Sequence, residues 1–165
     1  VDDANAQTAV LRNRVIGTQA NDVLRAPSRL FESEMGNLVA DAMRQKYPAV
    51  EAALTNSGGL RADLVCQPPS ANEAACEITW GEVFAVLPFG NRTVIETLTG
   101  QQLTEAFLNG FSPSCNNQIA TGRFPQVSGL KVQFHCEGAT PVIIPVFGLM
   151  VTFDPSGDPP LKGNT

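Results

Sequence analysis

The clearest helix in the sequence is predicted between Glu34 and Tyr47, where apolar residues recur at the spacing of one helical face. Ser33 stands directly before this stretch, and its hydroxyl can accept a hydrogen bond from a backbone N–H of the first turn. Pro48 follows the stretch and is expected to end the helix. The apolar stripe is expected to face the core, and it comprises Met35, Leu38, Val39, Ala42 and Met43.

Two shorter helices are predicted by capping boxes. In Thr79-Trp80-Gly81-Glu82 and in Thr99-Gly100-Gln101-Gln102, a threonine is followed three residues later by a side chain that can reach back to the threonine N–H. The first box predicts a helix to about Val86, and the second predicts a helix to about Phe111. In the second helix the inward-facing residues are expected to be Leu103, Ala106 and Phe107.

Strands are predicted where apolar and β-branched residues gather or alternate. The segment Pro141–Val146 carries little strand or turn signal. Helices and strands alternate loosely, and this predicts a single α+β or α/β domain whose mixed sheet packs against helices. The expected strands are 15–17, 52–55, 93–98, 130–135 and 149–153, with the last two as neighbours in one sheet.

The composition suits one globular domain, because the chain has 165 residues of which 43% are hydrophobic and 16% charged. We expect residues 1–26 to be a leading segment or linker remnant and residues 27–165 to be the domain. The formal net charge is −5, so nucleic acid is not an expected partner. We expect no membrane span, since no apolar run is long enough, and Val1-Asp2-Asp3 does not look like the start of a signal peptide.

The four cysteines contain no C-x-x-C pair, and His135 is the only histidine, so a zinc site is not expected and His135 is interpreted as an ordinary strand residue. Two disulfides would place the protein in an oxidising compartment: secreted, periplasmic or at the cell surface. Four unpaired cysteines are the alternative. Three pairings are possible. We favour Cys66–Cys76 and Cys115–Cys136, because each closes a polar loop between structured stretches.

The most suggestive polar stretch is the turn Asn56-Ser57-Gly58-Gly59, which follows an apolar run and precedes Arg61. Adjacent glycines let backbone N–H groups approach a ligand closely. An arginine offers a planar set of donors suited to phosphate or carboxylate. Taken alone, a plain connection between two strands is the commoner explanation, and the turn matches neither the G-x-G-x-x-G nor the P-loop pattern.

Five stretches carry more information together than any one of them: Glu32–Met43, Thr55–Arg61, Ile78–Phe84, Val86–Asn91 and Gly122–Gly129. In order and spacing they resemble the C-terminal, substrate-binding domain of the 5'-nucleotidase family, which includes ecto-5'-nucleotidase and periplasmic UDP-sugar hydrolases. The resemblance runs from about Val15 to Phe134. It implies the fold of that domain and a nucleotide or nucleoside as the small-molecule ligand.

The resemblance implies ligand contacts for seven residues. Arg61 would bind phosphate, and Arg29 would be a second phosphate-binding arginine, with an ordinary surface arginine as the alternative. Phe89 would stack on the base, with a core anchor at a helix end as the alternative. The implied ligand-binding residues are Arg29, Asn56, Gly58, Gly59, Arg61, Phe89 and Asn91.

The resemblance also implies a partner domain. In the family an N-terminal metallophosphoesterase domain holds two metal ions and carries out hydrolysis, while the C-terminal domain holds the substrate and rotates to deliver it. Such a metal centre needs several histidines and carboxylates, which a chain with one histidine does not supply. We therefore expect no catalytic residue, metal or cofactor in this chain, and divalent metals such as zinc or manganese in the absent domain.

One departure from the family pattern concerns the base clamp. The family's domain continues to an Asn/Gly-Gly-Asp-Gly-aromatic motif that supplies a second ring, and Ser156-Gly157-Asp158-Pro159 does not match it. Either half of the clamp is missing or the domain is incomplete at its C-terminal end. The expected function is the substrate-binding domain of a 5'-nucleotidase-type metallophosphohydrolase, and the alternative is a non-catalytic nucleoside- or surface-binding module of the same fold.

Overall fold

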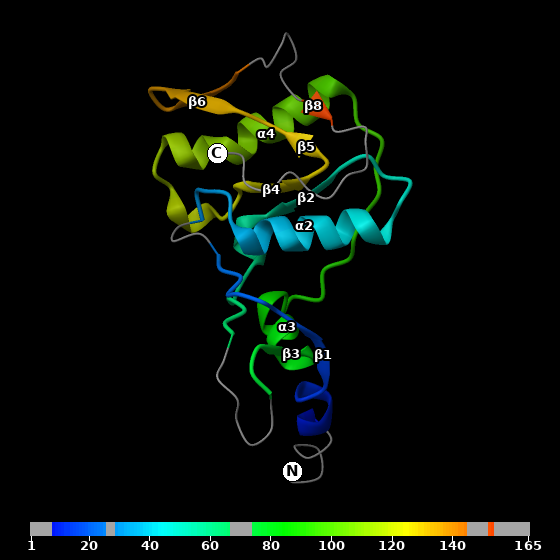
Figure 1. Cartoon of the computed structure of the whole chain (residues 1–165). Helices are drawn as coiled ribbons and strands as arrows, with labels where there is room; N and C mark the ends of the chain where they lie inside the picture. The colour runs from blue at the N-terminus through cyan, green and yellow to red at the C-terminus, as the bar shows by residue number, and fades with distance from the viewer. Residues whose placement is uncertain (1–7, 26–28, 67–73, 145–151, 154–165) are drawn as a thin grey trace. The chain divides into compact units, whose positions relative to one another are not determined.

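The computed structural model describes residues 8–25, 29–66, 74–144 and 152–153, which form two compact units (Figure 1). The smaller unit comprises residues 1–24 and 60–91, and the larger unit comprises residues 25–59 and 92–165. Helices combine with two-stranded antiparallel ladders, so the predicted α+β class is confirmed. The predicted domain boundary after residue 26 stays a prediction. Within the described ranges, no helix is long and apolar enough to cross a membrane.

The smaller unit is built on one antiparallel ladder. Strand β1 (Val15–Thr18) pairs with β3 (Glu77–Thr79), and helix α3 (Trp80–Val86) follows directly. The predicted capping box is present, because the Thr79 hydroxyl accepts from the Glu82 N–H while the Glu82 carboxylate accepts from the Thr79 N–H. The first predicted strand and the short helix are therefore confirmed.

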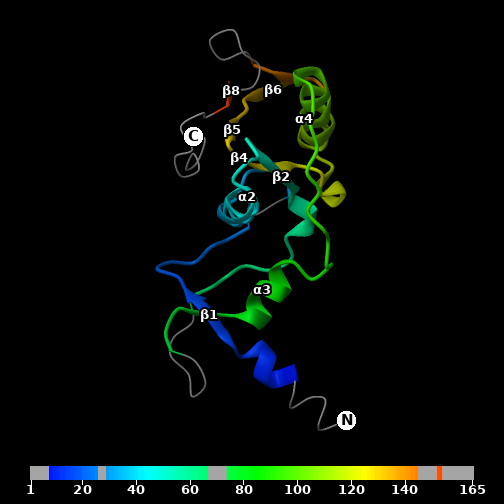
Figure 2. The same ribbon diagram turned by 90° about the vertical axis from the view of Figure 1, so that its right-hand side faces the viewer.

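The larger unit has a layered centre. Strand β2 (Ala53–Asn56) pairs antiparallel with β4 (Pro125–Ser128). Helix α2 (Glu34–Lys46) packs on one face of this ladder and helix α4 (Gly100–Cys115) on the other, as Figure 2 shows with α2 seen almost end-on. The Ser33 hydroxyl accepts from the Gly36 N–H at 3.0 Å, which confirms the predicted N-cap of α2.

The face that α2 presents to the ladder differs from the predicted stripe. Met35 and Val39 are buried as expected, but Leu38 is 44% exposed and Ala42 is exposed as well. Small residues lie against the strands instead, namely Gly36 and Ala40, which are both buried. Gly36 is needed there, because a Cβ at this position would overlap the side chain of Gln126 on β4.

Helix α4 covers the aromatic core. Leu103 and Phe107 face inward as predicted, whereas Ala106 is exposed. The helix also runs past the predicted end at Phe111, with Pro113 inside its last turn. A proline removes only its own N–H from the helix, and here the next turn is closed by a bond from the Asn116 N–H to the Ser112 carbonyl at 3.2 Å.

Phenylalanine rings fill the space between α4 and the strands. Phe111 stacks on Phe134 with ring centroids 4.0 Å apart, and Phe124 meets Phe111 at 5.4 Å. Because the rings come from α4, from the residue before β4 and from the start of β6, they hold the helix against the strands. The buried members of this core are Leu103, Phe107, Phe111, Phe124, Leu130 and Ile143.

The end of the chain forms two further ladders. The predicted strand 130–135 is divided into β5 (Leu130–Lys131) and β6 (Phe134–Glu137). Strand β7 (Thr140–Ile143) forms a hairpin with β6, although the sequence from Pro141 onward carries little strand or turn signal. Strand β8 (Thr152–Phe153) pairs with β5, which confirms the expected neighbours, while residues 149–151 lie outside the described residues.

Residues 93–98 were predicted to be a strand, and this prediction is wrong. The segment has no ladder partner among the described residues and no regular secondary structure. Val94, Ile95 and Leu98 are 71%, 57% and 53% exposed. An alternating pattern favours an extended backbone, but a strand forms only where a neighbour accepts its hydrogen bonds.

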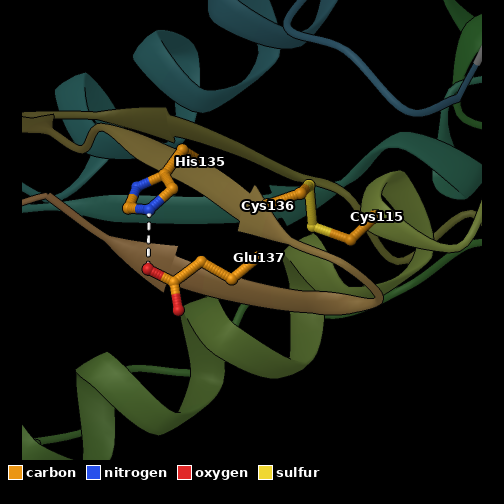
Figure 3. A network of polar contacts seen from close by, with 4 residues as sticks. All are labelled: Cys115, His135, Cys136 and Glu137. Atoms are coloured by element: carbon orange, nitrogen blue, oxygen red, sulfur yellow. Dashed lines mark hydrogen bonds and ion pairs between the residues drawn. A yellow bond between two sulfur atoms is a disulfide. The ribbon is translucent and has the colours of Figure 1, made fainter.

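Both favoured disulfides are present. Cys66 joins Cys76 in the smaller unit, and Cys115 at the end of α4 joins Cys136 on β6. The second bond ties the β6–β7 hairpin to the helix beneath it, as Figure 3 shows. The described part of the chain has no free cysteine.

Candidate functional site

The turn singled out in the sequence is held firmly against a distant segment. Strand β2 ends at Asn56, and the chain turns through the short 3-10 helix η1 (Ser57–Gly59). The Ser57 N–H donates to the Phe124 carbonyl, and the Gly58 N–H donates to the Gly122 carbonyl, both at 2.9 Å. The turn is therefore anchored to the stretch that leads into β4.

The Asn56 side chain strengthens this anchor. Its Nδ2 donates to the Gly122 carbonyl at 2.9 Å, so this single carbonyl accepts from both Asn56 and Gly58. The side chain remains exposed at the end of β2. The bond fixes the orientation of the amide, and within the described ranges the Asn56 Oδ1 accepts no hydrogen bond.

Gly58 and Gly122 cross at a distance that excludes a side chain. Gly122 has φ +59°, and a Cβ there would lie 2.6 Å from the Gly58 Cα. In the other direction, a Cβ on Gly58 would lie 3.0 Å from the Gly122 Cα. Gly122 therefore has no room for a side chain, whereas a side chain at Gly58 would require the Gly122 backbone to shift slightly.

Arg29 lies beside this crossing. Its carbonyl accepts from the Ser57 hydroxyl at 2.8 Å, and its Cδ is 3.7 Å from the place where a Gly122 Cβ would stand. The residue is half-buried. Among the residues that the structure describes, the Arg29 guanidinium makes no hydrogen bond or ion pair.

The smaller unit carries the other predicted ligand residues. The Arg61 N–H donates to the Val86 carbonyl at 2.9 Å, and the Arg61 Cζ lies 5.7 Å from the centroid of the Phe89 ring. This is a cation–π contact. Phe89 is 59% exposed, which does not fit the alternative of a core anchor, and Asn91 is exposed too.

The seven predicted residues thus form two groups, one in each unit. The first group gathers at the crossing of the turn with Gly122, and the second surrounds the Phe89 ring. The first comprises Arg29, Asn56, Gly58 and Gly59, and the second comprises Arg61, Phe89 and Asn91.

The larger unit also contains an apolar pocket of about 440 Å³, which none of the predicted residues lines. Its wall is mainly the phenylalanine core under α4, with Glu32 and Gln133 as polar members. The candidate site is therefore separate from this pocket.

One carboxyl group in the larger unit is perturbed. Burial raises the pKa of Asp41 on α2, against the opposing effects of a hydrogen bond from Ser128 and the nearby charge of Arg44. Its Oδ1 is buried without a hydrogen-bond partner among the described residues. The Arg44 Nε donates to the Ser128 hydroxyl at 2.9 Å, so these polar groups help to hold α2 on β4.

His135 has a partner of its own on β6. Its Nε2 lies 3.2 Å from a Glu137 carboxylate oxygen, on the surface beside the Cys115–Cys136 disulfide (Figure 3). Both side chains are largely exposed. No group of three or more histidine, cysteine, aspartate or glutamate side chains within the described ranges is placed to hold a metal ion.

Three residues with no predicted role help to shape the site. The Ser57 hydroxyl donates to the Arg29 carbonyl, the Gly122 carbonyl accepts from the Asn56 side chain, and the Gln126 Oε1 on β4 accepts from the Ser33 N–H at the start of α2. Gly122 and Gln126 belong to a stretch already recognised as a motif, Gly122–Gly129. Their contacts are long-range, and spacing along one sequence does not reveal which distant carbonyl a side chain will meet.

The family model of the 5'-nucleotidase, C-terminal domain matches residues 15–143. The chain therefore belongs to this family, as the motifs predicted. The match includes Arg29, the turn Asn56–Gly59, Arg61, Phe89 and Gly122.

Curated relatives include two bacterial proteins. The chain is 39% identical over 118 residues to the trifunctional nucleotide phosphoesterase protein YfkN of Bacillus subtilis, covering 70% of this chain and 7% of that protein. It is 34% identical over 148 residues to the cell wall protein Lmo0130 of Listeria monocytogenes, covering 81% of this chain and 17% of that protein. The chain thus spans only a small part of these relatives.

A solved structure with the same fold is that of a 5'-nucleotidase precursor from Thermus thermophilus. It matches with a TM-score of 0.67 and 36% identity, over 84% of this chain and 27% of that chain. The sequence and fold comparisons therefore agree on the family.

Proposed function

We propose that this domain holds the nucleoside and the phosphate of a nucleotide, as the specificity domain of a 5'-nucleotidase-type metallophosphohydrolase. The observation that supports this most is the turn Asn56–Gly59, fixed on Gly122 with the Arg29 side chain beside it. A turn that is already ordered loses little conformational entropy when a ligand binds. A planar guanidinium is well suited to a phosphate group.

The second group supplies a surface for the base. A ring that is 59% exposed offers a face on which a nucleobase can stack, and such stacking contributes roughly 1–3 kcal/mol per base. Arg61 lies over the same ring, so its planar donors are close to any ligand that stacks there. Asn91, two residues after Phe89, adds a polar side chain to this group.

We propose that hydrolysis belongs to an N-terminal metallophosphoesterase domain of the parent protein, with two divalent ions such as zinc or manganese. The short share of the relatives that this chain spans supports a longer parent. We further propose a secreted, periplasmic or cell-surface location, which the two disulfides and the name of the Listeria relative support.

Isothermal titration with AMP tests the binding role. Arg61→Ala and Arg29→Ala should each weaken AMP binding about tenfold to a hundredfold, because hydrogen bonds to charged groups contribute roughly 1.5–3 kcal/mol. Lys46→Ala is the matched control, since it removes one exposed positive charge from the end of α2. Unchanged AMP affinity in both arginine variants would rule out the proposed phosphate contacts.

A second candidate is a binding module without catalysis in its parent protein. It is favoured by the Listeria relative, whose name refers to the cell wall and to no activity. The parent protein would then bind AMP or adenosine but release no phosphate with added divalent metal. Release of phosphate under those conditions would exclude this candidate.

A further inference from the structure

The segment that carries Arg29 has an unusual form of support. Residues 29–33, called here the Arg29 arm, have no helix or strand and lead directly into α2. Irregular segments of this kind usually satisfy their backbone groups with water or with near neighbours in sequence. In this arm the backbone is held by side chains from three distant elements.

Three successive carbonyl groups of the arm each accept one side-chain hydrogen bond. The Ser57 hydroxyl donates to the Arg29 carbonyl at 2.8 Å, and the Ser114 hydroxyl donates to the Leu30 carbonyl at 3.0 Å. The Gln126 Nε2 donates to the Phe31 carbonyl at 2.8 Å.

Gln126 holds the arm at a second point. Its Oε1 accepts from the Ser33 N–H at 3.0 Å, so one amide side chain spans the arm from Phe31 to Ser33. Gln126 is only 1% exposed and Ser57 only 7%. Hydrogen bonds in such shielded positions are costly to leave unmade, so they restrict the arm strongly.

The Arg29 backbone and the Arg29 side chain differ in how they are held, and this difference suggests a function for the three hydrogen bonds. The backbone around Arg29 is fixed, whereas the guanidinium has no partner among the described residues and lies next to the Gly58–Gly122 crossing. Satisfying partly buried carbonyl groups explains the hydrogen bonds themselves. It does not explain why this support begins at an arginine whose guanidinium meets no partner in the described part of the chain.

We propose that Ser57, Ser114 and Gln126 are positioning residues that hold Arg29 ready for the phosphate group of the ligand. They act through the backbone of the arm and do not touch the ligand. This inference rests on the proposed nucleotide-binding function and adds to it three residues that determine how well Arg29 performs. A preorganised cation binds an anion more tightly because less freedom is lost on binding.

A double-mutant cycle tests whether Ser57 acts through Arg29. AMP, adenosine and inorganic phosphate are titrated calorimetrically into the full chain and into three variants: Ser57→Ala, Arg29→Ala and the double variant. Ser57→Ala should weaken AMP and phosphate binding about threefold to tenfold, the effect of one lost hydrogen bond, and change adenosine binding less than about twofold. In the Arg29→Ala background, Ser57→Ala should cause no further loss of AMP affinity.

Two results would overturn the inference. One is an equal loss of AMP and adenosine affinity in Ser57→Ala, which would indicate general damage to the fold. The other is a full additional loss of AMP affinity when Ser57→Ala is combined with Arg29→Ala, which would mean that Ser57 does not act through Arg29. Absence of saturable AMP binding in the unmodified chain would instead refute the proposed function itself.

A second pair of variants covers the case in which Ser57→Ala does not fold. Ser114 is only half-buried on α4, so Ser114→Ala should be tolerated, and it should weaken AMP binding about threefold without affecting adenosine. Ser114→Thr keeps the hydroxyl and should restore AMP affinity. Ser112→Ala is the matched control, because Ser112 lies on the same helix and its hydroxyl faces the Asn116 amide. Equal AMP affinities for all three variants would contradict the proposal.

Discussion

Gly122→Ala tests the crossing on which the candidate site depends. The residue has φ +59°, and an alanine Cβ would lie 2.6 Å from the Gly58 Cα and 3.1 Å from the Gly58 nitrogen. Both contacts are with backbone atoms, so no side chain can rotate away to relieve them. The turn must move, and the bonds from Gly58 and Asn56 to the Gly122 carbonyl, both 2.9 Å long, should break together.

The expected loss of stability has two parts. The left-handed conformation costs an alanine about 1–2 kcal/mol, and each lost hydrogen bond costs about 0.5–1.5 kcal/mol net. The free energy of unfolding should therefore fall by about 2–5 kcal/mol in Gly122→Ala. The range adds the lower and the upper ends of these two contributions.

Gly138→Ala is the matched control, because Gly138 lies in the same unit with φ +61° and has no atom within 4 Å of the Cβ position. It carries the conformational cost alone, about 1–2 kcal/mol. Urea unfolding followed by circular dichroism should show Gly122→Ala to be less stable than Gly138→Ala by roughly 2 kcal/mol. If the two variants differ by less than about 0.5 kcal/mol, the crossing does not have the tight geometry described.

Three further predictions concern stability. Gly36→Ala should destabilise the protein by about 1–3 kcal/mol despite the better helix propensity of alanine, because its Cβ would overlap the buried Gln126 side chain; thermal unfolding measures this. Because the pKa of Asp41 is raised in the native state, the unfolded state releases this proton first as the pH rises above 3.8, and the free energy of unfolding should then fall until the native state also loses the proton. Urea titrations at several pH values should show this fall in the unmodified chain and not in Asp41→Asn. Replacing Cys115 and Cys136 by alanine should cost about 3 kcal/mol, since the bond closes a loop with a sequence separation of 21.

The glycine and disulfide predictions each have a control within the chain. Gly100→Ala lies at the start of α4 with open space around its Cβ position, so it should be neutral or stabilising where Gly36→Ala is harmful. For Asp41, a variant with the same pH dependence as the unmodified chain would contradict the burial effect. Loss of the Cys66–Cys76 bond, with a sequence separation of 10, should cost slightly less than loss of the longer loop.

Local patterns predicted the helix starts well. Ser33, Thr79 and Thr99 cap their helices as expected, because capping depends on residues within one turn of each other. Both disulfide pairings were also predicted, from the polar loops that they close.

Features set by distant contacts were predicted poorly. Helix α4 runs past its predicted end at about Phe111 and includes Pro113, and its last residue, Cys115, is bonded to the distant Cys136. Leu38 was expected in the core, but the helix is turned so that Gly36 can accommodate Gln126. No periodicity within α2 itself carries that information.

In the candidate site, too, the local motif was predicted and the long-range contacts were not. The motifs predicted Asn56, the two glycines and Arg61 as the residues of interest, and the Asn56–Gly59 turn is ordered by its contact with Gly122. The hydrogen bond from Ser57 to the Arg29 carbonyl joins residues 28 positions apart, and a contact of this kind could not be predicted from the sequence pattern alone. The ligand-binding roles of the predicted site residues stay predictions.

The most direct test of nucleotide binding is an NMR titration of the isotope-labelled chain with AMP. We predict saturable shifts of backbone amide signals in the Asn56–Gly59 turn, at Arg61 and around Phe89 on addition of AMP. The Arg29 signal should also shift on addition of inorganic phosphate alone. Absence of saturable shifts, or shifts confined to the β6–β7 hairpin, would contradict this prediction.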